Sequence, residues 1–176
     1  METTKNNLPN DVKKFFNGLS EYLNTKLLYY GSVQRKDYFP GKSDIDVDIF
    51  TDNVNSTINK MQHYLRAERK KFKKFVWIVN HNNHFTTGYK IFYKDPSGKF
   101  NAEFSIYDEK YKEDILKEHL GKIVLPLHAT CLLIILKFLY YKLSLMNYDY
   151  FKYLKRKILT FFIGKPDDMF IVLDQK

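Results

Sequence analysis

Residues 31–50 read GSVQRKDYFPGKSDIDVDIF and hold the most informative pattern in the chain. The segment begins with a Gly-Ser pair and ends in an alternating run in which Asp44, Asp46 and Asp48 are separated by isoleucine and valine. Alternation with a period of two predicts a β-strand that presents all three carboxylates on one face. Carboxylates two residues apart lie about 6.6 Å apart along a strand and repel each other by roughly 2.5 kcal/mol at an effective dielectric constant near 20. We therefore expect a positive partner beside this strand.

The composition indicates an ordinary globular protein with a basic surface. The 176 residues are 44% hydrophobic and 28% charged, which is typical of one domain with a sizeable core. Lys and Arg outnumber Asp and Glu by 29 to 20, so the net charge is +9. This excess favours polyanionic partners such as nucleic acid or nucleotides, although a solvated lysine-rich surface explains it equally well.

Three features bear on the cellular compartment. Cys131 is the single cysteine, which excludes an intramolecular disulfide and agrees with a reducing compartment. Its apolar neighbours predict a small buried core residue. Residues 1–10 lack the apolar stretch of a signal peptide. Residues 123–145 are the most apolar segment, but they contain a proline, a histidine and two lysines, which indicates a buried helix rather than a membrane span. These features predict a cytoplasmic protein without membrane contact.

Periodicity predicts alternating helices and strands followed by helices. Apolar residues at helical spacing predict helices over about 10–25, 54–71, 109–120, 127–145 and 148–161. Short apolar or alternating runs predict strands over 26–30, 44–50, 75–80, 86–93 and 99–107. We assign no order to residues 165–176. The prediction is an α+β fold in which a mixed sheet of about five strands is packed by helices. Residues 1–110 form the core and residues 111–176 a C-terminal helical extension, together one compact unit.

The last expected strand carries a further acid. Glu103 lies between Ala102 and Phe104, and an acid in the middle of such a strand requires a partner. A glycine turn that lets the main chain approach a phosphate, together with three carboxylates, is the set needed for chemistry at a nucleoside triphosphate. Carboxylate oxygens suit Mg²⁺. Two such ions about 4 Å apart stabilise the attacking and leaving oxygens of an in-line displacement.

With these elements the chain resembles a small member of the DNA polymerase β-like nucleotidyltransferase superfamily. The signature of that family is Gly-Ser, a spacer, Asp-hydrophobic-Asp-hydrophobic on a strand and a carboxylate on a later strand. Its counterparts in this chain are Gly31-Ser32, the spacer 33–43, Asp44-Ile45-Asp46-Val47 and Glu103. The resemblance covers residues 27–107 by motif and the later helices by general layout. It implies a nucleotidyltransferase-type sheet followed by C-terminal helices.

The resemblance implies a role for each matching residue. Asp44 and Asp46 would bind both metal ions, Mg²⁺ or Mn²⁺, while Glu103 would bind the catalytic ion and accept the proton of the attacking hydroxyl. Gly31 and Ser32 would hold the β- and γ-phosphates of the NTP. The implied reaction transfers a nucleoside monophosphate, with ATP as the favoured donor, to an acceptor hydroxyl and releases pyrophosphate.

Three further residues complete the implied nucleotide site. Lys42 and Ser43 directly precede the first acid, and Arg35 matches an arginine that often follows the Gly-Ser pair in small members of the family. Those members usually place a glycine next, where this chain has Lys36. This departure affects the local turn.

Asp48 allows a second register in which Asp46 and Asp48 form the metal pair. We favour Asp44 and Asp46 because they lie nearer the start of the strand and therefore nearer the Gly-Ser turn. Asp48 then lies about 6.6 Å beyond Asp46 and is expected to pair with a lysine or arginine below the site. A non-enzymatic αβ domain with salt-bridged acids is the alternative for the whole set, but three unpaired acids on a half-buried strand are costly.

The acceptor stays open at this point. The positive charge and 17% aromatic residues favour the 3′ end of a nucleic acid. A basic cluster, expected at the end of the second helix, is either a solvated helix end or a contact for phosphates. Its members are Arg66, Arg69, Lys70, Lys71, Lys73 and Lys74. Small nucleotidyltransferases also modify proteins and small molecules, and an inactive nucleotide- or partner-binding domain of the same fold is a further alternative. The sequence leaves the oligomeric state open.

Overall fold

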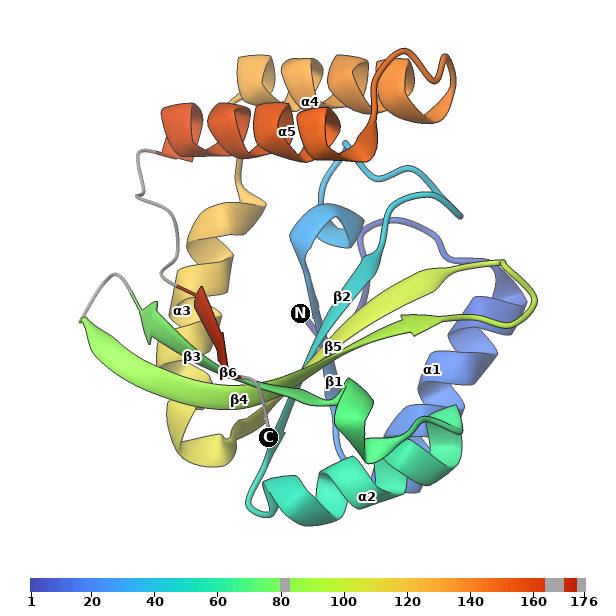
Figure 1. Cartoon of the computed structure of the whole chain (residues 1–176), viewed down its shortest axis with the longest axis vertical. Coiled ribbons are helices and arrows are strands. Elements are labelled where there is room, and N and C mark those ends of the chain that lie inside the picture. Colours follow the sequence, from blue (N-terminus) through green and yellow to red (C-terminus); the bar gives the residue numbers. More distant parts are fainter. Residues whose placement is uncertain (80–82, 164–169, 174–176) are drawn as a thin grey trace.

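The computed structural model describes residues 1–79, 83–163 and 170–173 and contains one mixed β-sheet with helices on both faces (Figure 1). The strands lie in the order β1-β2-β5-β4-β3-β6. Their bounds are β1 Leu27–Tyr30, β2 Ile45–Thr51, β3 Lys73–Val79, β4 His84–Lys94, β5 Asn101–Asp108 and β6 Phe170–Leu173. β2 and β5 run parallel, and the other neighbouring pairs are antiparallel. The predicted α+β class and mixed sheet are confirmed.

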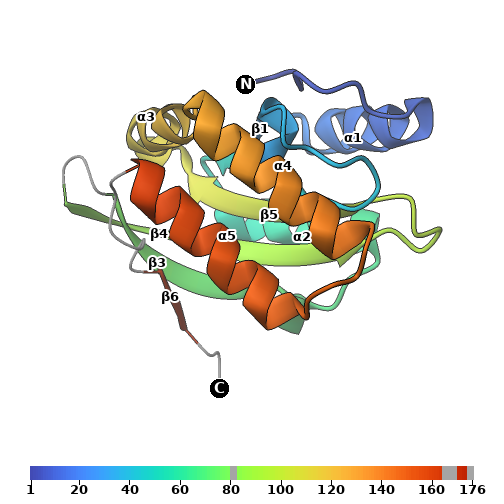
Figure 2. The same cartoon turned by 90° about the horizontal axis from the view of Figure 1, so that it is seen from above.

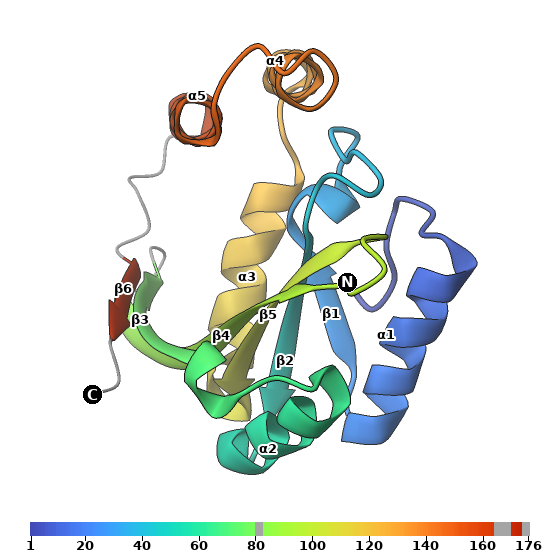
Figure 3. The same cartoon turned by 45° about the vertical axis from the view of Figure 1, so that its right-hand side comes forward.

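The helices form three groups around the sheet. Their bounds are α1 Asn10–Leu23, α2 Val54–Leu65, α3 Lys112–Ile123, α4 Leu127–Tyr141 and α5 Tyr148–Ile163. α1 and α2 cover one face of the sheet, and α3 lies on the opposite face (Figure 3). α4 and α5 form an antiparallel pair that lies across one end of the sheet, where the short 3-10 turn η1, Gly31–Gln34, follows β1 (Figures 1 and 2).

The alternation in β2 decides which face of the sheet is apolar. Ile45, Val47 and Ile49 are fully buried in the core formed with α1 and α2. Asp46 and Asp48 therefore point to the opposite face, where α3 packs through residues such as Ile115. α3 covers only part of that face, so the polar side chains of β2 and β5 lie between α3 and the pair α4 and α5.

The second helix ends six residues earlier than predicted, at Leu65. Arg66 adopts a left-handed conformation with φ +49°, and the amides of Arg66 and Ala67 bond back to the carbonyls of His63 and Gln62. A left-handed residue with such backward hydrogen bonds ends a helix and lets the chain turn away from it. The basic cluster is consequently divided among the helix end, the 3-10 turn η2 (Arg69–Lys71) and β3. The expectation that all of it ends one helix is wrong.

The apolar segment 123–145 is not one buried helix. It is interrupted after Ile123, and α4 begins at Leu127 and buries only one face, which includes Ala129, Leu133 and Lys137. Cys131 lies on the outer face and is exposed, so the prediction of a core cysteine is wrong. None of the described helices combines the length and the apolar character that a membrane span requires.

A strand forms where the sequence suggested none. Residues 170–173 of the tail form β6, which pairs antiparallel with β3 at the margin of the sheet. The rest of the expected tail, residues 165–169 and 174–176, lies outside the described residues. The sheet therefore has one strand more than predicted.

Candidate functional site

Two acids expected to act together lie on facing positions of the central parallel pair of strands. Asp46 on β2 is the register partner of Glu103 on β5. Neighbouring strands lie about 4.8 Å apart, and paired residues point to the same face, so the two carboxylates share one surface. Both side chains are partly buried. The strand pairing therefore joins residues that are 57 positions apart in the chain.

The Gly-Ser turn lies directly against this pair. Tyr30, the last residue of β1, is the register partner of Asp46, and the chain turns into η1 at the next residue. Gly31 has φ +67°, and a Cβ atom at this position would lie 2.0 Å from Oδ2 of Asp46. Only glycine fits a backbone that turns in this way beside the carboxylate. Ser32 follows and is buried.

Asp44 completes the acidic group from just before β2. Its side chain is exposed and accepts a hydrogen bond from Asn101. Partial desolvation of the carboxylate by its neighbours raises the pKa of Asp44, and the charge of Glu103 raises it further, whereas Lys155 on α5 and Lys137 on α4 lower it. The acids thus receive positive charge from the helical pair that lies over them.

Lysines supply positive charge to the acidic group formed by Asp44, Asp46 and Glu103. Lys90 on β4 lies 2.7 Å from Oε1 of Glu103. Burial raises the pKa of Asp46 to about 7, helped by the negative charges of Glu103 and Asp44 and opposed by the positive charges of Lys155 and Lys90. Asp46 is therefore poised between its protonated and ionised forms near neutral pH.

A buried lysine fixes the loop that connects the turn to the acids. Lys137 of α4 is 1% exposed and donates from Nζ to the carbonyl of Asp37 at 2.7 Å, to Oδ2 of Asp37 at 2.8 Å and to Oγ of Ser43 at 3.4 Å. Arg35 holds the other side of the Asp37 carboxylate with two hydrogen bonds of 2.8 and 3.2 Å. Residues 35–43 are thereby attached to a helix about one hundred positions later in the chain.

The expected nucleotide residues of this loop differ in their surroundings. The Arg35 guanidinium binds Asp37, and the Ser43 hydroxyl is buried, accepting from the amide of Phe39 at 3.2 Å. Lys42 is exposed. Of the three, only Lys42 presents its side chain to solvent without a fixed contact in the described part of the chain. A nucleotide contact by any of the three stays a prediction.

Asp48 pairs with a histidine and not with the lysine or arginine that we expected. Oδ2 of Asp48 lies 3.1 Å from Nε2 of His119 on α3, and the Asp48 side chain is fully buried. The His119 ring stacks on Tyr30 and Trp77, with ring centroids 4.1 and 5.5 Å away. α3 thus covers Asp48 through His119, whose ring contacts with Tyr30 and Trp77 hold the imidazole against this face of the sheet. Asp44 and Asp46 lie beyond this cover, on the side of the turn.

The donor chemistry of the acids fits a divalent cation. Asp44, Asp46 and Glu103 offer hard oxygen ligands, the type that Mg²⁺ and Mn²⁺ prefer. Within the described residues, no three His, Cys, Asp or Glu side chains are grouped so that they could hold a metal ion as they stand. The Lys90 ammonium occupies one oxygen of Glu103. A cation at these acids would therefore compete with Lys90 for Glu103.

Sequence reasoning did not identify the lysines that surround the acids. Lys90 and Lys155 lie in ordinary alternating and helical segments, where a lysine is unremarkable. The position of Lys137 could have been recognised from the sequence. It falls four residues after Leu133, and therefore on the same apolar face of the helix, which is buried. A charge on such a face predicts a buried partner, and Asp37 is that partner.

The comparisons with known proteins agree with this geometry. Residues 11–120 match the family described as nucleotidyltransferase domain. That range contains η1, β2 and β5, and so contains all three acids and the turn. No curated protein and no solved structure matches the chain.

Proposed function

Because the chain belongs to the nucleotidyltransferase domain family, we propose that it transfers a nucleoside monophosphate from an NTP, with ATP favoured, to an acceptor hydroxyl and releases pyrophosphate. The observation that carries the proposal is the pairing of Asp46 with Glu103 beside the Gly31 turn. It brings carboxylates and main-chain amides to one place, the combination that binds a cation together with phosphates.

We assign the residues as follows. Asp44 and Asp46 hold Mg²⁺ or Mn²⁺, with Glu103 as the third ligand. A divalent ion there supplies the charge that stabilises the attacking and leaving oxygens. The amides of η1 and the Ser32 hydroxyl hold the β- and γ-phosphates. The oxygen of the acceptor hydroxyl forms a bond to the α-phosphorus, the bond from that phosphorus to the bridging oxygen breaks, and pyrophosphate leaves with the electron pair.

Glu103 takes the proton of the acceptor hydroxyl in this proposal. A carboxylate positioned beside the reacting group is a common general base, and the Lys90 ammonium, 2.7 Å from Oε1, holds this one in place. In this proposal Lys155 on α5, whose charge reaches both Asp44 and Asp46, also attracts the triphosphate of the NTP. Its positive charge suits that ligand.

The favoured acceptor is the 3′ hydroxyl of a nucleic acid. The net charge of +9 attracts polyanions, and the acids lie on a face that α3 covers only in part. A protein or small-molecule hydroxyl is the alternative acceptor. The test below separates these possibilities because each acceptor yields a different labelled product.

The test uses the full chain with Mg²⁺ or Mn²⁺ and each of the four NTPs labelled on the α-phosphate. Acceptors are a single-stranded RNA, a single-stranded DNA, the same oligonucleotides with a 3′-deoxy end, and the protein itself. We expect label to enter the oligonucleotide with a 3′ hydroxyl, with an equal amount of pyrophosphate released. Label in the protein band identifies the alternative acceptor.

Matched variants decide whether the acids carry the reaction. Asp46→Asn and Glu103→Gln keep the shape and remove the charge, and each should lower transfer by at least about 100-fold. Asp52→Asn is the control, because Asp52 is an exposed acid just after β2 and away from the pair. NTP binding without transfer to any acceptor would contradict the proposal and indicate an inactive nucleotide-binding domain.

A further inference from the structure

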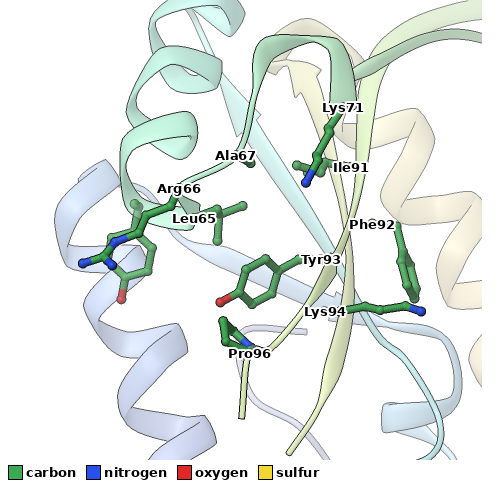
Figure 4. A pocket seen from close by; sticks show the side chains of 10 residues that line it. Leu65, Arg66, Ala67, Lys71, Ile91, Phe92, Tyr93, Lys94 and Pro96 are labelled. Carbon is green, nitrogen blue, oxygen red and sulfur yellow. The ribbon is translucent and has the colours of Figure 1, made fainter. Parts of the chain in front are cut away.

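A groove lies at the outer margin of β4, apart from the acids. The end of α2, the segment that follows it and the last residues of β4 enclose a cavity of about 670 Å³ (Figure 4). Neither the turn η1 nor any of the three acids lines it. The proposed reaction therefore leaves this cavity without a role.

The floor of the groove is an open strand edge. β4 pairs with β3 only as far as Lys90, whereas its pairing with β5 continues to Lys94. Residues 91–94 therefore have a strand neighbour on one side only. The main-chain groups on the other side of such a segment are available to a ligand.

Three cations surround this edge. Arg66, Lys71 and Lys94 line the cavity, all three are exposed, and no acid lines it. None of the three forms an ion pair within residues 1–79, 83–163 and 170–173. Two acids near the groove have other hydrogen-bond partners, because Glu68 binds Lys70 at 2.7 Å and the Asp95 carboxylate accepts hydrogen bonds within its own turn. The charge of Glu68 also reaches Lys71, but the groove keeps a net positive charge that suits a polyanion.

Aromatic side chains connect the groove to the acids. Phe92 and Lys94 point to one side of β4, and Tyr93 and Ile91 point to the other (Figure 4). Phe92 is 45% exposed and is the register partner of Glu103, one strand away. Its ring therefore lies on the same face of the sheet as the Glu103 carboxylate, on a neighbouring strand whose backbone is about 4.8 Å away. An exposed aromatic ring in this position is a surface on which a base can stack.

We infer that this groove binds the phosphate backbone of a single-stranded nucleic acid, with a base stacked on Phe92 and the 3′ end directed to Glu103. The direction of the strand, with its 3′ end toward Glu103, rests on the proposed function. The binding itself does not. Three unpaired cations and one exposed ring beside a catalytic carboxylate match a chain of phosphates and bases. An extended peptide on the open edge would have only four residues of backbone to pair with and would gain nothing from the cations.

The experiment measures binding of fluorescent 12-nucleotide RNA and DNA single strands by anisotropy, in EDTA and without NTP. The groove variant is Arg66→Asn, Lys71→Gln and Lys94→Gln, in which asparagine suits the left-handed conformation at position 66. The control variant is Lys5→Gln, Lys14→Gln and Lys117→Gln, which removes the same charge from exposed positions outside the groove. Polyphosphate and a duplex serve as competitors. Circular dichroism checks the fold of each variant.

We expect the groove variant to bind single strands at least about 10-fold more weakly and to lower the slope of log K against log salt concentration by about 2, as three lost phosphate contacts require. Phe92→Leu should weaken binding about 5-fold or more without changing the slope. The control variant should keep most of the affinity. The RNA and DNA arms show which single strand is preferred.

Three results overturn the inference. Equal losses in the groove and control variants would mean that diffuse surface charge alone binds the strand. If polyphosphate or a duplex competes as well as a single strand does, the site does not contact an unpaired base. If no oligonucleotide binds, the inference is wrong, and the open strand edge would suit a peptide or another ligand instead. Because no NTP or metal is present, a protein that binds single strands but transfers no nucleotide refutes the proposed function and not this site.

Discussion

A Cβ atom on Gly31 would lie 2.0 Å from Oδ2 of Asp46, a distance that non-bonded atoms do not reach. The turn and the acid therefore occupy space that only a glycine leaves free. The same glycine has φ +67°, so the backbone direction and the close approach depend on one residue. The Gly-Ser turn and strand β2 therefore form a single unit, although the spacer loop separates them in the chain.

Gly31→Ala should therefore damage both stability and nucleotide binding. The left-handed backbone alone costs an alanine about 1–2 kcal/mol, and displacement of the Asp46 carboxylate adds to this. Urea unfolding measures the first effect and titration with an NTP and Mg²⁺ measures the second. Gly98→Ala is the matched control, because Gly98 has φ +72° but no atom within 4 Å of its Cβ position. Equal effects of the two substitutions would contradict the close approach that we describe.

The sequence predicted this unit because its signals are local. A Gly-Ser pair after an apolar run and acids at every second position identify a turn and a strand without knowledge of distant contacts. The position of Glu103 beside Asp46 depended on the alternation in residues 101–107, which places that acid on one face of a strand. The α+β class and the mixed sheet followed from the order of these elements and are confirmed.

Lys90 should act as a removable counter-charge for Glu103. In Lys90→Met the Glu103 carboxylate loses the ammonium that lies 2.7 Å from its oxygen and 5.6 Å from the Phe75 ring centroid, while an apolar stem of similar length is kept. Without this competitor, we expect Mn²⁺ to bind about 3- to 10-fold more tightly when no NTP is present, as the loss of a partly exposed ion pair of about 1 kcal/mol implies. Calorimetric titration measures the affinity.

The control for this prediction is Lys73→Met. Lys73 is exposed and is the register partner of Lys90 on the neighbouring strand. Its substitution therefore removes a nearby positive charge but leaves the Lys90–Glu103 ion pair in place. Unchanged or weaker Mn²⁺ binding in Lys90→Met would show that this lysine does not compete with the ion.

The sequence did not predict the contacts between distant segments. The pairing of β6 with β3 depends on four residues that lie about one hundred positions beyond their partner strand. Asp37 and Lys137 are 100 positions apart, and nothing local distinguishes Asp37 from a solvated loop acid. The exposed side of α4, with Cys131 on it, has the same composition as the buried side. Hydrophobicity alone therefore could not tell which face of that helix packs.

Lys137→Met should loosen the loop that carries Ser43 and the first acid. The substitution keeps the apolar stem but leaves the Asp37 carboxylate with Arg35 as its remaining cation, which we expect to cost about 2–3 kcal/mol of unfolding free energy. Asp37→Asn in the Lys137→Met background should recover part of this loss, because the neutral amide no longer needs the ammonium. Chemical denaturation of the single and double variants measures the coupling.

The same pair predicts a loss of activity that stability alone does not explain. Lys137 touches residues 37 and 43 and neither acid of the paired strands, so Lys137→Met should lower transfer at temperatures where the protein is still folded. A variant that is less stable but fully active would show that the loop holds its position without the lysine.

The raised pKa of Asp46 should make the stability of the metal-free protein depend on pH. Burial raises the pKa from 3.8 to about 7, so the folded state binds the proton more tightly than the unfolded state does. Between pH 4 and pH 7 the folded state therefore holds more protons at this site, and the free energy of unfolding falls as the pH rises. Above pH 7 both states are ionised and this contribution is constant.

Asp46→Asn removes this titration and isolates its effect. In EDTA, the stability of Asp46→Asn relative to the wild type should rise from pH 4 to pH 7, by at most about 1.4 kcal/mol per pH unit, and then level off. Saturating Mg²⁺ should remove the advantage of the variant at pH 7 and above, because the cation stabilises the ionised carboxylate of the wild type. Asp52→Asn should show no such trend. A constant difference across the pH range would mean that the pKa of Asp46 is the same in the folded and unfolded states, and burial and the neighbouring acids around the Gly31 turn would then be fully offset by the surrounding lysines.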